Sequence, residues 1–192
     1  MNECYRKEKF RKWWPLIERI EKLESNIWDW ACERGLDNST IEKQYNKLIE
    51  EIDELRQAID DNNIPEIYDA IGDITVVLTI MERMYKGCVV GDLIKWMGVE
   101  KENIPSVINS SYQIIPITEA ANFLSQQINR NTCPELAMSI VSEDIIYHLD
   151  ILANRYGSRV LECAELAYNE IKDRKGEMVD GYFIKEGRNN EY

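Results

Sequence analysis

The sequence predicts an all-α protein, a helical bundle that contains an internal helical-hairpin repeat. Glycine and proline are scarce, with 9 and 5 among 192 residues. No stretch alternates apolar and polar residues with a sustained period of two, whereas apolar residues recur at helical spacing over long segments. Two such stretches also align with each other. These observations favour helices throughout and a single domain, residues 1–192.

Most of the predicted helices carry a local signal at one end. Gly35 can end the first helix in a left-handed conformation. Ser39, with Glu42 three residues later, matches a capping box that starts the second helix. Pro65 and Pro134 suit the first turns of two later helices. The predicted helices cover residues 15–34, 40–61, 64–86, 88–97, 117–130, 134–156 and 158–175.

Residues 49–85 align with residues 117–156, and the alignment keeps the hydrophobic skeleton. The second copy lacks the acids of the first, with Ala120 in place of Glu51 and Phe123 in place of Glu54. We interpret the likeness as a duplication rather than a chance similarity of two amphipathic hairpins. The aligned pairs are Glu50/Glu119, Leu55/Leu124, Ile59/Ile128, Pro65/Pro134, Glu66/Glu135 and, after a slip of two residues, Asp73/Asp144 and Tyr85/Tyr156. The predicted parts are a first repeat at 20–98, a linker at 99–116, a degenerate second repeat at 117–175 and a tail at 176–192.

The charge and cysteine content narrow the class of protein. The chain has 35 acidic and 23 basic side chains, a net charge of -12, which argues against broad binding to nucleic acid or to an anionic membrane. No apolar run approaches the length of a membrane span. Five cysteines without a CxxC pair favour reduced thiols. We therefore expect a cytoplasmic protein.

Two neighbouring segments concentrate carboxylates. In "KLIEEIDELRQAI", residues 47–59, Glu50, Glu51 and Glu54 share one helical stripe, opposite an apolar face, which alone is typical of a solvated surface. In "EIYDAIGDITVVLTIM", residues 66–81, the stripe that carries Asp69 and Asp73 continues into a face of buried character. Clustered carboxylates repel one another unless a cation compensates them. Oxygen ligands of this kind suit Mg²⁺ or Mn²⁺, so the two segments predict a divalent-metal site.

These segments resemble the MazG-like all-α nucleoside triphosphate pyrophosphohydrolases, relatives of the dimeric dUTPases. The family pattern E-E-x-x-E is met by "EEIDE", residues 50–54. The second pattern, often E-E-x-G-D, departs at Ala70, although "DAIGD" supplies two aspartates, and Glu66 is the weakest candidate acid. "WDWACERGL" resembles the leading helix, and "AYNEIKDRKGEMVDGYFIKE" resembles the tail of phage-type members. The match covers residues 26–86 and 159–186.

The resemblance implies a function and a set of site residues. The implied reaction is (d)NTP + H₂O → (d)NMP + pyrophosphate, with Mg²⁺ or Mn²⁺ as cofactor. The implied metal ligands are Glu51, Glu54, Asp69 and Asp73. The implied catalytic residues are Glu50, Glu51, Glu54 and Asp73, with Glu50 as the acceptor of the water's proton. The implied substrate-binding residues are Lys47, Trp28, Trp30, Lys172, Arg174 and Lys175. Deoxypurine nucleotides are favoured as substrates, with dUTP and ppGpp as alternatives.

Other interpretations of the same residues stay open. Lys47 can instead only pair with Glu51 or Glu54 on its own helix. The basic cluster at 172–175 can simply favour a helix C-terminus. At least one of the two tryptophans is expected to be core packing. As a whole, the chain can instead be a helical interaction or nucleotide-binding protein with a vestigial metal site. The resemblance also implies a homodimer, and a phage-encoded protein in the host cytoplasm.

Overall fold

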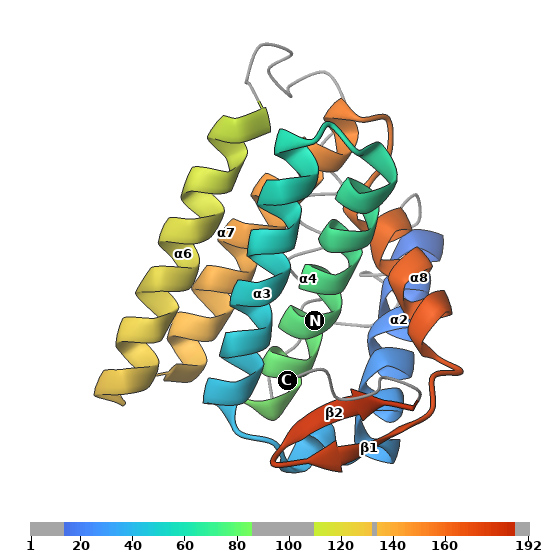
Figure 1. Cartoon of the computed structure of the whole chain (residues 1–192), viewed down its shortest axis with the longest axis vertical. Coiled ribbons are helices and arrows are strands. Elements are labelled where there is room, and N and C mark those ends of the chain that lie inside the picture. Colours follow the sequence, from blue (N-terminus) through green and yellow to red (C-terminus); the bar gives the residue numbers. More distant parts are fainter. Residues whose placement is uncertain (1–13, 86–109, 132–133, 187–192) are drawn as a thin grey trace, which may run out of the picture.

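In the computed structural model, which describes residues 14–85, 110–131 and 134–186, the chain is an all-α bundle with one small β-hairpin (Figure 1). Within the described residues, no helix is both long and apolar enough to cross a membrane. The elements are α2 (Trp14–Glu33), η1 (Leu36–Asn38), α3 (Ile41–Asp60), α4 (Ile64–Met84), α6 (Ser110–Arg130), α7 (Pro134–Arg155), α8 (Val160–Ile171), β1 (Gly176–Val179) and β2 (Tyr182–Lys185).

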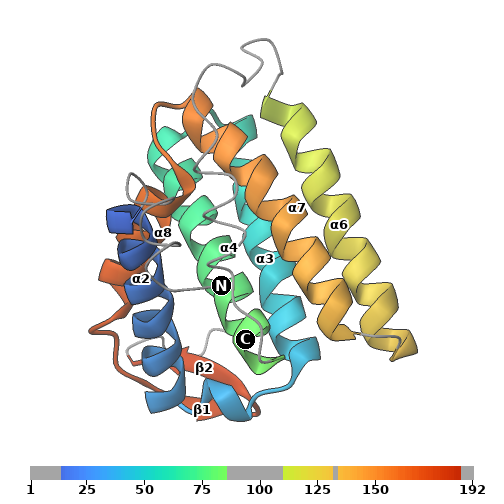
Figure 2. The ribbon, with the colours of Figure 1, turned by 180° about the vertical axis from the view of Figure 1, so that it is seen from behind.

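Helix α4 is the centre of the bundle. It packs against α3 and α7, and on its other side against α8 and α2. Helices α6 and α7 form the outer pair on one flank, and α2 and α8 cover the opposite flank, as views from the front and from behind agree (Figures 1 and 2). From Ile74 to Glu82 every side chain of α4 is buried. The apolar run was therefore correctly predicted to be buried nearly all round.

The two predicted helical hairpins are both present. Helices α3 and α4 pack on each other, as do α6 and α7, and α3 also packs on α6. Aligned positions have similar burial: Glu51 and Ala120 are both buried, whereas Glu54 and Phe123 are both exposed. Of the aligned apolar pairs, Leu55 and Leu124 are both fully buried. The bundle is thus built the same way with and without the acids, while the duplication itself stays a prediction.

Several helix ends match the predictions. Gly35 has a φ of 74°, the left-handed conformation that glycine adopts without steric cost. Pro65 lies in the first turn of α4, and α7 begins at Pro134. The predicted cap Ser39 was wrong, because α3 begins one residue later and Thr40 accepts the Lys43 backbone N–H. The predicted helix at 88–97 lies outside the described residues.

Two boundaries differ from the predictions. Helix α6 begins at Ser110, so residues 110–116 of the predicted linker are helical, with Pro116 inside the helix. The predicted helix to residue 175 ends at Ile171, and residues 176–185 of the predicted tail form a β-hairpin, while residues 187–192 lie outside the described residues. Its turn residues Asp180 and Gly181 both have positive φ, which is typical of a two-residue turn that matches strand twist. The "DG" dipeptide was the available signal for this hairpin.

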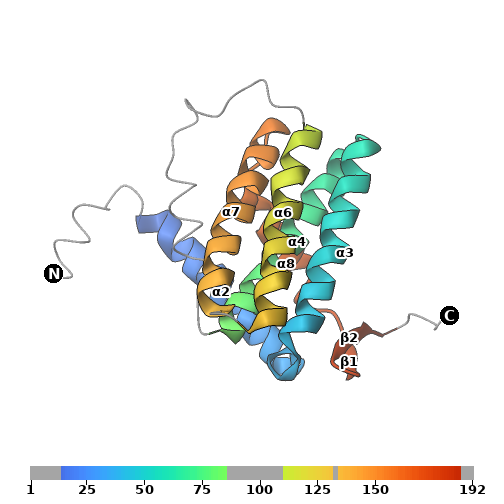
Figure 3. The same cartoon turned by 90° about the vertical axis from the view of Figure 1, so that its left-hand side faces the viewer.

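The hairpin lies at one end of the bundle, beside the start of α3 and away from α6 and α7 (Figure 3). Its antiparallel register pairs Gly176 with Lys185 and Val179 with Tyr182. Polar contacts fasten its turn to the start of α3: Ser39 Oγ donates to the Gly181 carbonyl at 2.8 Å, and Lys43 Nζ donates to the Asp180 carbonyl. These contacts place the hairpin over the carboxylates of α3 and α4.

Candidate functional site

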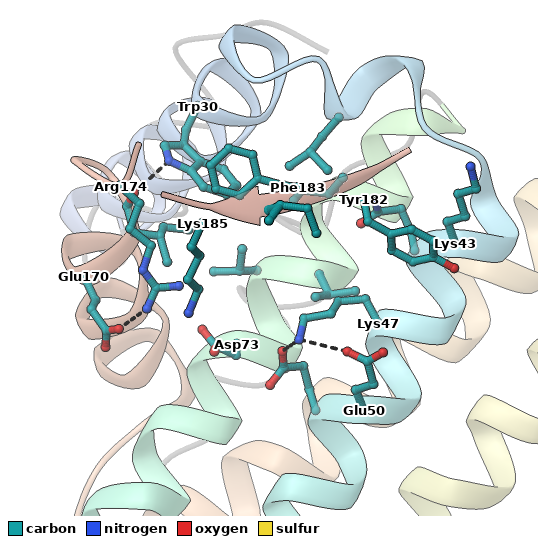
Figure 4. A pocket seen from close by; sticks show the side chains of 18 of the residues that line it. Trp30, Lys43, Lys47, Glu50, Asp73, Glu170, Arg174, Tyr182, Phe183 and Lys185 are labelled. Carbon is teal, nitrogen blue, oxygen red and sulfur yellow. Dashed lines mark hydrogen bonds and ion pairs between the residues drawn. The ribbon is translucent and has the colours of Figure 1, made fainter. Parts of the chain in front are cut away.

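A cleft of about 740 Å³ lies between α3, α4, the end of α8 and the hairpin. The sequence-predicted acids of α3 and α4 form its floor, and the hairpin forms its roof (Figure 4). Residues separated by more than 100 positions in the chain therefore meet in one cavity. The polar residues that line it are Lys43, Gln44, Lys47, Glu50, Glu51, Glu54, Asp69, Asp73, Glu170, Arg174, Asp180, Tyr182 and Lys185.

Glu51 is the most buried acid of the floor, with 3% of its surface exposed. Its Oε1 accepts from Lys47 Nζ at 2.7 Å, while its Oε2 is buried without a hydrogen-bond partner in the described structure. Burial raises the pKa of Glu51, and the ion pair with Lys47 offsets only part of that rise. An unsatisfied buried carboxylate oxygen is costly, so the chemistry of this atom fits a cationic ligand.

Lys47 acts as the internal counterion of the floor. It also reaches Glu50 Oε2 at 3.1 Å, so one ammonium bridges two glutamates one turn away on its own helix. Burial alone would lower the pKa of Lys47, but the hydrogen bonds and charges of Glu51 and Glu50 outweigh it and raise the pKa. The pairing interpretation of Lys47 is thus confirmed, and the same side chain lines the cleft.

Asp73 faces Glu51 across the interface of α3 and α4. Burial, followed by repulsion from Glu51 and Asp69, raises its pKa from 3.8 to about 7, although Arg174 and Lys47 act in the opposite direction. Asp69 stands one turn earlier, at the rim. Partial burial and repulsion from Glu170 and Glu66 raise its pKa as well. The floor therefore holds more negative charge than its own cations compensate.

The chemistry of the side chains in the cleft suits a divalent cation, because they offer carboxylate oxygens from two adjacent helices. One of these oxygens, Glu51 Oε2, is buried and has no hydrogen-bond partner among the described residues. Glu51, Glu54, Asp69 and Asp73, the four predicted ligands, all line the cleft. In the conformation described here, no three Asp, Glu, His or Cys side chains among the described residues stand close enough to form a ready-made metal group.

Two basic side chains enter the cleft at the hairpin: Arg174 lies just before β1, and Lys185 is the last residue of β2. Arg174 and Lys185 point down into the cleft toward the side where Asp73 lies (Figure 4). Arg174 is paired with Glu170 one helical turn earlier, which holds its guanidinium at the cleft wall. Of the four predicted basic residues, Lys47 and Arg174 reach the cleft. Sequence reasoning missed Lys185, because its position became meaningful only once the tail was known to fold back as a hairpin.

Three predicted substrate-binding residues are not part of the cleft. Lys172 and Lys175 are exposed and absent from the cleft lining, and Lys172 bonds Asn169 at 3.0 Å instead. Trp28 lies on another face of α2, with the Arg83 guanidinium 5.6 Å from its ring centroid. Trp28 and Trp30 are two positions apart on one helix, so their side chains point in different directions and cannot both face one site. Trp30 does line the cleft, but it is 9% exposed.

Arg34 positions the junction between α8 and the hairpin. Its guanidinium donates to the carbonyls of Arg174 at 2.7 Å, Lys172 at 3.2 Å and Trp30 at 3.2 Å. It also lies 4.8 Å from the ring centroid of Trp30 and 5.9 Å from that of Phe183. A single side chain therefore closes the end of α8 and fastens the roof to α2. No sequence motif indicated this role.

We expect Arg34→Ala to loosen the roof. The carbonyls of residues 172 and 174 lose their donor, so amide hydrogen exchange should become faster across residues 176–185, and the free energy of unfolding should fall by about 1–3 kcal/mol. The control is Arg56→Ala, since Arg56 is exposed and pairs with Asp53 of its own helix. Equal exchange rates in the two variants would contradict the role of Arg34.

The fold and the cleft define an all-α protein with an acidic cleft that a β-hairpin covers, with Arg174 and Lys185 at one end of that cleft. No family model and no solved structure matches the chain. A segment of 65 residues, 33% of this chain, is 40% identical to an uncharacterized 18.2 kDa protein from the rep-hol intergenic region of Haemophilus phage HP1. The match spans 40% of that phage protein, so the similarity links part of each chain.

Proposed function

We propose that the chain is a metal-dependent nucleoside triphosphate pyrophosphohydrolase of the MazG-like type. The observation that carries this proposal is the cleft itself: carboxylates from two adjacent helices stand opposite Arg174 and Lys185, around a buried Glu51 oxygen that lacks a partner. The carboxylates would bind a divalent cation and the two basic side chains would bind phosphate oxygens, so a triphosphate with its cation is complementary to both sides of the cleft. The similarity to a phage protein agrees with the proposed phage origin.

In the proposed reaction, the residues of the cleft have three roles: they hold the cation, bind the phosphates and accept a proton. Glu51, Glu54, Asp69 and Asp73 would hold the cation, which when bound neutralises the triphosphate and lowers the pKa of a water molecule. Arg174 and Lys185 bind phosphate oxygens from the roof, and Lys47 does so from α3 when it leaves Glu51. The exposed carboxylate of Glu50 accepts the proton of the attacking water. Attack at the α-phosphate then releases pyrophosphate.

A hydrolysis assay on the purified chain tests the proposal. Common NTPs, dNTPs and ppGpp are incubated with Mg²⁺ or Mn²⁺, and the products are separated by chromatography. We expect a nucleoside monophosphate and pyrophosphate, with deoxypurine nucleotides as the best substrates. Absence of turnover across the whole panel would overturn the proposal.

Glu54→Gln should lower this turnover by about 100-fold, because a neutral amide is a poor ligand for a hard cation. The matched control is Glu66→Gln. Glu66 is an exposed acid in the first turn of α4 that does not line the cleft, so its variant should keep wild-type turnover. An equal loss in both variants would show that general charge, rather than the cleft, governs the activity.

A second candidate is a nucleotide-binding protein that does not hydrolyse its ligand. The bridging of Glu50 and Glu51 by Lys47 favours it, since the chain already supplies one internal cation. Under this alternative, titration calorimetry detects nucleotide binding, while the hydrolysis assay yields no pyrophosphate. The two measurements therefore separate the candidates.

A further inference from the structure

The cleft is polarised along its length. Arg174, Lys185 and Glu170 lie at one end of the roof, and Tyr182 lies near the other end, above α3 (Figure 4). Apolar side chains of α4 and the hairpin, such as Val76 and Val179, also line the cavity. A ligand with a polyanionic end and a flat apolar end therefore matches the cleft in one direction.

Tyr182 is held in place by residues of α3. Asn46 Nδ2 donates to the phenolic oxygen of Tyr182 at 3.3 Å. Lys43 Nζ lies 5.5 Å from the ring centroid and also donates to the carbonyl of Asp180 in the hairpin turn. These contacts orient the ring, yet 38% of the residue stays exposed. The ring is held at its hydroxyl by Asn46 and on one face by Lys43, so a stacking partner would contact the opposite face without reorganisation of the ring.

The other two aromatic residues of the cleft wall, Trp30 and Phe183, are packed against neighbouring side chains. Trp30 is 9% exposed, and its Nε1 donates to the Ile171 carbonyl at 2.9 Å. Phe183 makes an edge contact with Trp30, with ring centroids 5.9 Å apart, and lies beneath Arg34. Among the described residues that line the cleft, Tyr182 is therefore the aromatic side chain best able to contact a ligand.

We propose that Tyr182 is the platform on which the nucleobase stacks, with the phosphates at the Arg174 and Lys185 end of the cleft. The inference rests on the proposed function, because it assumes a nucleotide in the cleft. It assigns base stacking to Tyr182 of the hairpin, in place of Trp28 and Trp30 of α2, which were expected from the sequence to bind the substrate. The roof then binds both ends of the ligand, and Asn46 and Lys43 are positioning residues for the ring.

Equilibrium binding of two probes separates the base from the phosphates. The probes are the α,β-methylene analogue of dATP, which resists cleavage at the α-phosphate, and inorganic tripolyphosphate, each with Mg²⁺. Tyr182→Ala should weaken binding of the analogue by about tenfold or more, the usual effect of losing one base–aromatic stack, and leave tripolyphosphate binding unchanged. Tyr182→Phe should retain analogue binding, because the ring remains. Lys185→Ala should weaken both probes.

The outcomes distinguish the inference from the function on which it rests. Unchanged analogue affinity in Tyr182→Ala, or an equal loss for both probes, overturns the stacking role while leaving nucleotide binding intact. If the wild-type chain binds neither probe, the proposed function fails and the inference fails with it. Thermal melts of each variant confirm that the hairpin substitution leaves the bundle folded.

Discussion

Asp73→Asn is expected to stabilise the protein at pH 8 in the absence of metal ions, and to lower the proposed metal-dependent hydrolysis by about 100-fold or more. The two effects have one cause. Burial and the charges of Glu51 and Asp69 oppose ionisation of Asp73, so the ionised acid destabilises the folded chain. Asparagine has nearly the same shape and cannot ionise, which removes the penalty together with the charge that a cation would require.

The raised pKa of Asp73 determines how the folding stability changes with pH. The pKa of Asp73 is raised in the folded chain, from 3.8 to about 7, so between these values the folded state binds more protons than the unfolded state. The contribution of Asp73 to stability is then fully favourable below pH 4 and is lost as the pH rises to 7. At 1.36 kcal/mol per pKa unit the upper bound is about 4 kcal/mol, and solvent contact of this half-buried group reduces the expected difference to about 1–3 kcal/mol.

Urea unfolding of the wild type and Asp73→Asn across pH 4–8 measures this difference. The stability gain of the variant should grow up to pH 7 and stay level above it. Asp144→Asn is the control, because Asp144 occupies the aligned position of the second hairpin and its side chain is 53% exposed. A gain that does not vary with pH, or one that Asp144→Asn reproduces, would contradict the account of Asp73.

Gly72→Ala should destabilise the protein by about 2 kcal/mol or more, although alanine is the better helix former. A Cβ atom at this position would lie 2.4 Å from the Cys163 carbonyl oxygen and 2.7 Å from the Cβ of Ala167. Helix α8 packs directly on α4 here, and a backbone carbonyl cannot yield by changing rotamer. The gain of about 1 kcal/mol from helix propensity is therefore smaller than the steric cost.

A double variant tests the origin of this effect. Gly72→Ala combined with Ala167→Gly removes the Cβ contact but leaves the Cys163 carbonyl in place, so it should recover only part of the lost stability. Because α8 leads into Arg174, both variants should also weaken the proposed nucleotide binding relative to the wild type. If Gly72→Ala alone proved stabilising in urea unfolding, the close packing of α8 on α4 would be wrong.

Much of the helical framework could be predicted from local patterns. The predicted segments at 40–61 and 64–86 differ from α3 and α4 by at most two residues at each end. Hydrophobic spacing and Pro65 were sufficient there, because a helix buries a continuous stripe and its ends require particular residues. The prediction failed at Pro116, where a proline lies inside α6, and at the tail, where a helix was extended past Ile171.

The candidate site was predictable in its acids and much less so in its cations and aromatic residues. Helical geometry groups Glu50, Glu51 and Glu54 on one stripe of α3, and Asp69 and Asp73 on one stripe of α4. The packing of these two consecutive helices then brings both stripes to one cleft. The basic cluster at 172–175 was selected by proximity in sequence, and only Arg174 of it lines the cleft. Lys185 and Tyr182 depend on a turn at Asp180 and on contacts with α3, which no local pattern encodes.

By itself, the sequence determined an all-α bundle of amphipathic helices with a carboxylate cluster between two of them, because periodicity and capping act over a few residues. The tertiary structure alone decided what stands opposite those carboxylates. The hairpin reaches the cleft through contacts that span about 140 positions, from Ser39 and Lys43 to the turn and from Arg34 to the end of α8. Such contacts form only when α2, α3 and α8 are already packed, so their partners cannot be found from spacing along the chain.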